Sequence, residues 1–167
     1  MSGPLRTEKL EPTHRIDGFD SGAPPLDRFL IRHALQSQRA GASQTYLALQ
    51  GDRIVGYHSL AVGEVAYEDA AERLTKGMAR HPVPIMLLAR LAVARDMQGQ
   101  GIGAGLLKDA LLRTAQAASI AGIRTLVVHA KNDAARAFYE RNDFAPSPTD
   151  PFHLYLLLKD VRALLES

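Results

Sequence analysis

The chain has no cysteine among its 167 residues. Without thiols it forms no disulfide bond, no thiolate-bound zinc site and no covalent intermediate on cysteine. Any group transfer should therefore run directly from donor to acceptor. No metal site is expected either, because metal-ligand spacing is missing from the six histidines, which stand at 14, 33, 58, 81, 129 and 153.

Long apolar runs are also missing. No stretch of about 18 apolar residues is present, so no transmembrane helix is expected. The N-terminal residues lack the apolar centre of a signal peptide, and we expect a cytoplasmic protein without membrane association. With 46% hydrophobic residues, the length suits one compact core, and the whole of 1–167 is expected to be a single domain.

Charge is nearly balanced, and a formal net charge of +2 does not by itself indicate nucleic-acid binding. Its distribution is more informative. At about 100° per residue, predicted helices over 25–39 and 68–80 would each place three cations on one side. Each row is either an RNA-binding surface or an ordinary solvated helix face, and the pattern favours neither. The rows are Arg28, Arg32 and Arg39 in the first helix and Arg73, Lys76 and Arg80 in the second.

The most informative segment is a turn in which three glycines occur within five residues, at 99, 101 and 103. An apolar strand precedes the turn and an amphipathic helix follows it. Glycines let successive backbone N–H groups converge without obstruction by Cβ, and the helix adds the positive end of its dipole. The segment therefore predicts an anion site suited to a diphosphate-bearing cofactor.

Three glycine-rich phosphate motifs compete for this segment. A P-loop is excluded, because Gly103 is followed by Ala104 and Gly105 rather than by Lys and a hydroxyl residue. The spacing is wrong for a dinucleotide-binding turn, although Gly101-Ile-Gly103-Ala-Gly105 retains some ambiguity. Gln98-x-x-Gly101-x-Gly103 after a strand closely resembles the acetyl-CoA pyrophosphate loop of the GNAT acetyltransferases.

The order of predicted elements indicates an α/β fold with a mixed sheet. Strands over 43–49 and 53–61 form an antiparallel hairpin around Gly51-Asp52. The next predicted elements are a strand over 84–94, a helix ending near Gly122 and a strand over 125–130. This order requires the two strands to form a parallel pair with a right-handed crossover, which places the glycine turn at the strands' C-terminal end. The remaining elements are a helix over 132–142, a strand over 152–158 and a closing helix from Asp160.

This order resembles the GNAT fold over most of the chain, with its splayed parallel strands at the cofactor site. Several segments are similar to GNAT toxins of bacterial toxin–antitoxin modules, namely 19–22, 26–30, 82–93, 98–103, 107–111, 128–130 and 138–140. The resemblance implies an acetyl-CoA-dependent toxin that acetylates the α-amine of aminoacyl-tRNA and blocks translation. It further implies a ribbon-helix-helix antitoxin and a homodimer. One departure is Ser21, where such toxins often have cysteine.

The resemblance also assigns cofactor-binding residues. The pantetheine arm would run along the backbone of Leu91, Ala92 and Val93, and Arg95 would add a phosphate contact. Asn132 would reach the pantetheine or thioester region, although it is equally suited to cap the following helix. The pyrophosphate would be held by Gln98, Gly99, Gln100, Gly101, Ile102 and Gly103.

Tyr139 is the residue that the resemblance favours for catalysis. Amine attack on a thioester expels a thiolate with a pKa near 8.5, and a phenol with a pKa near 10 can donate a hydrogen bond or a proton as that charge develops. The alternative for a tyrosine in Phe138-Tyr139 is half-buried packing with the hydroxyl at the surface. Phe138 is assigned to the core.

No general base is evident, and positioning could suffice, because a free α-amine has a pKa of about 7.7–8.0 that esterification lowers further. Glu64 and Glu68 are placed as in other GNATs, but ordinary solvated carboxylates fit them better. His129 lies in a predicted buried strand and is interpreted as a core histidine. Arg90 interrupts an apolar strand and needs a partner, either a carboxylate or a phosphate near the acceptor end of tRNA.

Three hypotheses follow. The first is the toxin that N-acetylates aminoacyl-tRNA. The second is an acetyltransferase for a small-molecule amine or a protein N-terminus, which would turn over without RNA. The third is a non-catalytic module that binds acetyl-CoA or RNA, for which Tyr139→Phe would be silent. Fold alone does not choose among them.

Overall fold

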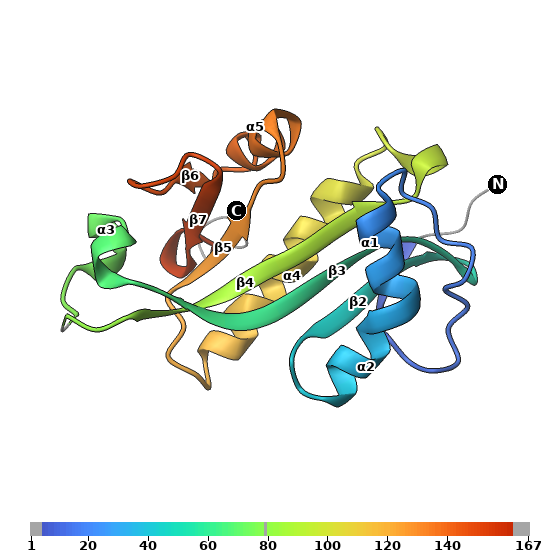
Figure 1. Ribbon diagram of the computed structural model, residues 1–167, viewed down its shortest axis with the longest axis horizontal. Coiled ribbons are helices and arrows are strands. Elements are labelled where there is room, and N and C mark those ends of the chain that lie inside the picture. The colour runs from blue at the N-terminus through green and yellow to red at the C-terminus, as the bar shows by residue number, and fades with distance from the viewer. Residues whose placement is uncertain (1–4, 79, 162–167) are drawn as a thin grey trace. The chain divides into compact units, whose positions relative to one another are not determined.

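A computed structural model describes residues 5–78 and 80–161 (Figure 1). The chain forms two compact units, the first comprising Met1–Ala61 with Ala89–Ala110 and the second Val62–Leu88 with Leu111–Ser167. None of the helices in the described part is long and apolar enough to cross a membrane. The single domain expected from the sequence stays a prediction.

The first unit is built on an antiparallel hairpin. Strand β2 (Gln44–Gln50) pairs with β3 (Arg53–Val65) around Gly51, whose φ of 62° suits glycine in a tight turn, so the predicted hairpin is confirmed. Strand β1 (Leu5–Lys9) adds to the outer edge of β2. It was not predicted, because its sequence LRTEK has no apolar alternation and its side chains are exposed or half-buried.

A helical segment packs on this hairpin (Figure 1). It consists of α1 (Pro24–Arg28), a π-helical turn (Phe29–His33) and α2 (Ala34–Arg39). The buried side chains of Phe29, Leu30 and Ala34 join a core that includes Leu47 and Tyr57.

The π-helical turn corrects the first predicted basic row. Each π turn holds one residue more than an α turn, which rotates the following residues by about 100° relative to an uninterrupted helix. Arg28, Arg32 and Arg39 are all exposed. Arg39, beyond the turn, therefore does not continue the line set by the other two.

In the second unit, β4 (Val83–Val93) begins parallel to β5 (Thr125–His129), with Met86 opposite Leu126. Strand β7 (His153–Leu157) runs antiparallel to β5, and the short β6 (Ala145–Pro146) pairs with β7. The predicted parallel pair and last strand are confirmed. The strand order is β1-β2-β3-β4-β5-β7-β6 in one mixed sheet, as the predicted fold class requires.

The predicted helix over 68–80 is wrong. The structure has a 3-10 turn at Tyr67–Asp69 and a single helical turn, α3 (Glu72–Thr75). Gly77, with a φ of 78°, adopts a left-handed conformation that an α-helix does not continue through. Arg73, Lys76 and Arg80 therefore form no helical row.

Two longer helices complete the fold. Helix α4 (Ile102–Ala118) follows the glycine turn and ends four residues before the predicted Gly122. Helix α5 (Asp133–Arg141) matches the helix predicted over 132–142, because residues 132 and 142 are its N-cap and C-cap. Residues 158–161 are helical and start the predicted closing helix. The rest of that predicted helix lies outside the described residues.

Candidate functional site

The glycine turn of the first unit has the backbone geometry of an anion site. After β4 the chain makes a 3-10 turn (Arg95–Met97), and Gly99 and Gly101 then adopt φ angles of 81° and 85°. Such angles are strained for residues with a Cβ, so glycine is required at both positions. Helix α4 starts at Ile102, directly after the second of them.

The amide groups of this turn are available to a ligand. In the described part of the chain, no backbone hydrogen bond is made by the N–H groups of 98–104. They gather at the N-terminus of α4, a helix of 17 residues whose dipole adds positive potential there. The segment therefore offers a set of unpaired donors to an anion, and the binding of an anion there stays a prediction.

Gln98 anchors the turn to the rest of the unit. Its side-chain nitrogen donates to the main-chain oxygens of Ser21 at 2.8 Å and Val93 at 3.1 Å. Ser21 is itself fixed, because its hydroxyl donates to a carboxylate oxygen of Asp27 at 2.6 Å. Sequence reasoning missed this role, since a glutamine beside a glycine turn does not reveal its distant partner.

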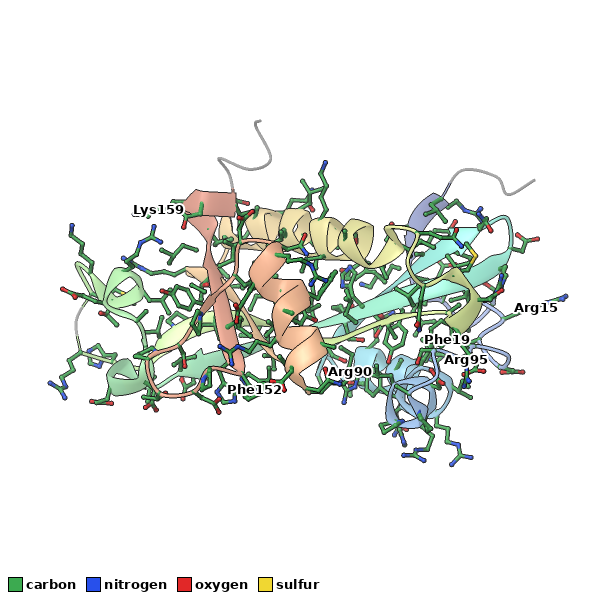
Figure 2. All side chains as sticks on the ribbon, turned by 90° about the horizontal axis from the view of Figure 1, so that it is seen from above. Arg15, Phe19, Arg90, Arg95, Phe152 and Lys159 are labelled. Carbon is green, nitrogen blue, oxygen red and sulfur yellow. The ribbon has the colours of Figure 1, made fainter. Side chains whose placement is uncertain are left out.

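Arg95 lies beside the turn and pairs with a carboxylate. Its guanidinium donates to Asp20 at 3.2 Å, and its side chain remains 68% exposed. Figure 2 labels Arg95. The amide of Gly22 and the guanidinium of Arg95 together lower the pKa of Asp20. Arg95 and Phe19 both line an open hollow of the first unit. A phosphate contact by Arg95 stays a prediction.

Strand β4 presents Leu91 and Val93 to one cluster and Ala92 to another. Leu91 and Val93 pack against the apolar group that contains Ile102, whereas Ala92 faces the core around Tyr57. The backbone of Ala92 also lies close to β3, since a Cβ placed on Gly56 would be 2.8 Å from the oxygen of Ala92. Gly56 thus allows a close approach of two strands at the segment predicted to bind the pantetheine.

Arg90 has a partner that the sequence did not suggest. Its guanidinium carbon lies 3.5 Å from the centre of the Phe29 ring, which is a cation–π contact. Figure 2 labels Arg90. Neither a carboxylate nor a phosphate is needed to explain a half-buried arginine here. The neighbouring Tyr57 donates its hydroxyl to the oxygen of Leu26 at 2.6 Å, and burial raises the pKa of Tyr57.

In the second unit, Asn132 caps α5. Its side-chain oxygen accepts a hydrogen bond from the amide of Ala135 at 2.8 Å. The capping alternative is therefore confirmed. A second role at the pantetheine stays a prediction.

Tyr139 is buried on α5, with 6% of its surface exposed. Its ring makes edge-on contacts with Phe138 and Phe144, whose ring centres lie 5.2 Å and 5.5 Å away. Burial raises the pKa of Tyr139 above the usual value for a phenol. The hydroxyl therefore stays protonated at neutral pH, which is the state that a proton donor needs.

Two carboxylates and a histidine complete the predicted set. Glu64 is exposed, and Glu68 pairs with Arg80 at 3.1 Å. A backbone hydrogen bond and the pairing with Arg80 lower the pKa of Glu68, which makes it a weaker base. The interpretation of His129 as a core histidine is wrong, since it is an exposed residue at the end of β5.

Comparison with known proteins decides which family this geometry belongs to. The family model of the GNAT acetyltransferase domain matches residues 41–146. The chain belongs to the GNAT acetyltransferases.

Within this family the chain is similar to toxins. It is 46% identical over 165 residues to a tRNA-acetylating toxin of Mycobacterium tuberculosis, with 99% of each chain covered. A structure of AtaT complexed with acetyl-methionyl-tRNAfMet superposes with a TM-score of 0.89 at 26% identity, covering 97% of this chain and 99% of AtaT. A mutant AtaT toxin bound to acetyl-CoA and the C-terminus of the antitoxin AtaR gives a TM-score of 0.81 at 26% identity, covering 98% and 99%.

The first unit fits the donor that GNAT acetyltransferases use. Acetyl-CoA carries a diphosphate, and the unpaired amides of 98–104 at the start of α4 match an anion of that kind. The absence of Cβ atoms at Gly99 and Gly101 leaves the backbone open to it. The enzyme is thus an acetyl-CoA-dependent acyltransferase.

Proposed function

We propose that this GNAT acetyltransferase is a toxin that transfers an acetyl group to the α-amine of aminoacyl-tRNA and thereby blocks translation. Its full-length similarity to the mycobacterial tRNA-acetylating toxin carries the proposal. A GNAT fold alone would leave the acceptor open, because related folds serve many acceptors.

The first unit holds the donor in this proposal. The backbone of Leu91, Ala92 and Val93 supports the pantetheine arm, and Arg95 contacts a phosphate. When bound, acetyl-CoA supplies an activated acetyl group. The pyrophosphate is bound by Gln98, Gly99, Gln100, Gly101, Ile102 and Gly103, with Gln98 acting through the backbone it anchors.

Tyr139 supplies the proton that the sulfur takes up when the C–S bond breaks. Its raised pKa keeps the phenol protonated, and its ring is held by edge-on contacts with Phe138 and Phe144. Transfer is direct, because the chain has no cysteine to carry an acyl group. A thiolate leaving group with a pKa near 8.5 requires only modest help from such a donor. Asn132 orients the start of α5, which carries Tyr139.

Exposed cations supply the contacts to the RNA backbone. In the second unit a groove of about 280 Å³ is lined by Arg73, Lys76, Arg124 and Lys159, and Figure 2 marks Lys159. Arg124 is held by the oxygen of Lys76 at 3.2 Å. Phosphate contacts of this kind position a nucleic acid without reading its sequence. Other proposed contacts come from the exposed Arg28, Arg32, Arg39 and Arg80 and from the half-buried Arg90.

The proposal includes partners and a compartment. AtaT is seen with the C-terminus of its antitoxin AtaR, and we expect a ribbon-helix-helix antitoxin to neutralise this protein in the same manner. We also expect a homodimer. Because its substrate is charged tRNA, the protein would act in the cytoplasm.

The test is acetyl transfer from labelled acetyl-CoA to separate acceptors. Bulk aminoacylated tRNA, deacylated tRNA, free amino acids and polyamines are compared, with wild-type protein and Tyr139→Phe. Label on charged tRNA only, reduced at least about 100-fold by Tyr139→Phe, supports the proposal. Phenylalanine keeps the ring contacts with Phe138 and Phe144, so the variant should fold.

Other outcomes overturn the proposal. Label on free amines without RNA would indicate an acetyltransferase for small molecules. Label on deacylated tRNA would show that the acceptor is not the aminoacyl group. Binding of acetyl-CoA without transfer to any acceptor, and with Tyr139→Phe silent, would indicate a binding module.

A further inference from the structure

A small pocket lies in the second unit, where β5 ends and β7 begins. Its cavity of about 60 Å³ is bounded by apolar side chains, among them Val65, Leu74 and Val127. His129 and His153 form part of its wall. A water-sized group needs about 10–15 Å³ of such a cavity, so the space admits a few non-hydrogen atoms. That is the size of an amino group with a short side chain.

The two histidines are stacked. His129 on β5 lies opposite His153 on β7 in the antiparallel register, so both side chains project from the same face of the sheet. Their ring centres are 4.0 Å apart and the rings are inclined by 21°. Nε2 of His153 is 3.5 Å from a carboxylate oxygen of Asp150.

We propose that this pocket binds the acceptor amine of the aminoacyl group, that His129 accepts the proton released by the attacking nitrogen, and that His153 is a positioning residue. The inference rests on the proposed function. It assigns a base to a reaction for which the sequence indicated none.

Partial burial and the stacked His153 favour a neutral His129, against the effect of Asp150. Asp69 from the turn before α3 and Tyr155 from β7 also line the pocket, and Asp150 lies beside His153. Burial and the neighbouring His153 lower the pKa of His129, whereas Asp150 acts in the opposite direction. A proton on both stacked rings would place like charges 4.0 Å apart. A neutral imidazole near pH 7 is the form that accepts a proton.

His129 and Tyr139 together account for the protons in the reaction. As the C–N bond forms, the nitrogen of the neutral amine releases one proton to His129. As the C–S bond breaks, the sulfur takes one proton from Tyr139. Transfer from the imidazolium to the phenolate through solvent restores both groups. The sum is amine plus thioester giving amide plus thiol.

The test is the pH dependence of acetyl transfer to aminoacyl-tRNA between pH 5.5 and 9. In the wild type kcat should fall as the pH drops through the pKa of His129, below about 6.5. His129→Gln should lower kcat at least tenfold, change KM less than threefold and abolish this limb. His153→Gln should move the limb to higher pH, because His153 is one of the groups that lower the pKa of His129. His81→Gln, at an exposed histidine outside the pocket lining, is the matched control.

A second measurement separates this inference from the proposed function. Titration of the full chain with alanine methyl ester, followed by NMR of the imidazole signals, should shift His129 and His153 but not His81. Unchanged His129 and His153 signals, or an unaltered pH profile in His129→Gln when charged tRNA is acetylated, overturns the inference alone. If charged tRNA is not acetylated but a small amine is, the pH dependence of kcat is measured with that amine. An unaltered pH dependence in His129→Gln would again overturn the inference.

Discussion

The side-chain nitrogen of Gln98 donates to the main-chain oxygen of Ser21 across 2.8 Å, joining two segments that are 77 residues apart in the sequence. The same nitrogen donates to Val93 at the end of β4. The entry to the glycine turn is thus fixed from two sides. Because amides that are already arranged bind an anion better, we expect this anchor to affect how well an anion is held.

Gln98→Leu should weaken donor binding. The leucine fills similar space but leaves the oxygens of Ser21 and Val93 without this donor, which costs about 1–2 kcal/mol for two hydrogen bonds. We expect KM for acetyl-CoA to rise about fivefold to twentyfold, with kcat at saturation nearly unchanged. Steady-state kinetics and thermal melts measure both effects.

Gln98→Glu is a second test of whether the side-chain amide of Gln98 anchors the turn. A carboxylate would face two carbonyl oxygens, so the loss should exceed that of Gln98→Leu. Gln36→Glu, the same change on an exposed face of α2, is the control. Equal effects of the leucine and glutamate variants would show that the amide does not anchor the turn.

Gly56→Ala should destabilise the first unit. A Cβ at this position would lie 2.8 Å from the oxygen of Ala92 and 2.8 Å from Cδ1 of Leu106, so β4 must move. We expect a loss of about 1–3 kcal/mol in the free energy of unfolding, together with weaker binding of acetyl-CoA. Denaturant unfolding and calorimetric titration measure the two.

Gly18→Ala is the control for that substitution, since nothing lies within 4 Å of an added Cβ there. It should change the free energy of unfolding by less than about 0.5 kcal/mol. A Gly56→Ala protein as stable as Gly18→Ala would contradict the close approach of the two strands.

The groove in the second unit should contribute to tRNA affinity. Replacing Lys76 and Lys159 by glutamine removes two of the four cations that line it. We expect KM for charged tRNA to rise about tenfold at low salt and the salt dependence of that KM to become shallower, because fewer counterions are released. KM for acetyl-CoA should stay constant.

Lys9→Gln, at an exposed position on β1, serves as the control for the groove variant. An equal effect on tRNA affinity from the control would mean that overall charge matters and the groove does not. An unchanged salt dependence in the double variant would remove the groove from the tRNA-binding surface.

Stability should fall on mild acidification, partly through His129. Its pKa is lowered in the folded state by partial burial and by His153, so the unfolded chain binds more protons below about pH 6.5. Stability from this group is therefore fully present above that pH and is lost as the pH decreases. Urea unfolding between pH 7.5 and 5.5 should show a smaller slope for His129→Gln than for the wild type. Identical slopes would contradict the lowered pKa.

Local patterns explain which parts of the fold were predictable. The β2–β3 hairpin and the strand, helix and strand around the glycine turn follow from short-range turn and periodicity signals. Strand β1 carries no apolar alternation and forms because β2 offers an edge. The helix predicted over 68–80 failed because helical spacing of charges does not reveal the left-handed Gly77.

The candidate site likewise has parts that the local sequence predicts and parts that depend on distant contacts. The sequence by itself determined the glycine turn, the α4 that follows it and the cap at Asn132, because each depends on neighbours within a few residues. Only the tertiary structure decided the partners of Gln98 and Arg90 and the stacking of His129 on His153. The contacts of Gln98 with Ser21, of Arg90 with Phe29 and of His129 with His153 join residues 24 to 77 positions apart. Packing and strand register set which distant segments meet, and no local spacing encodes them.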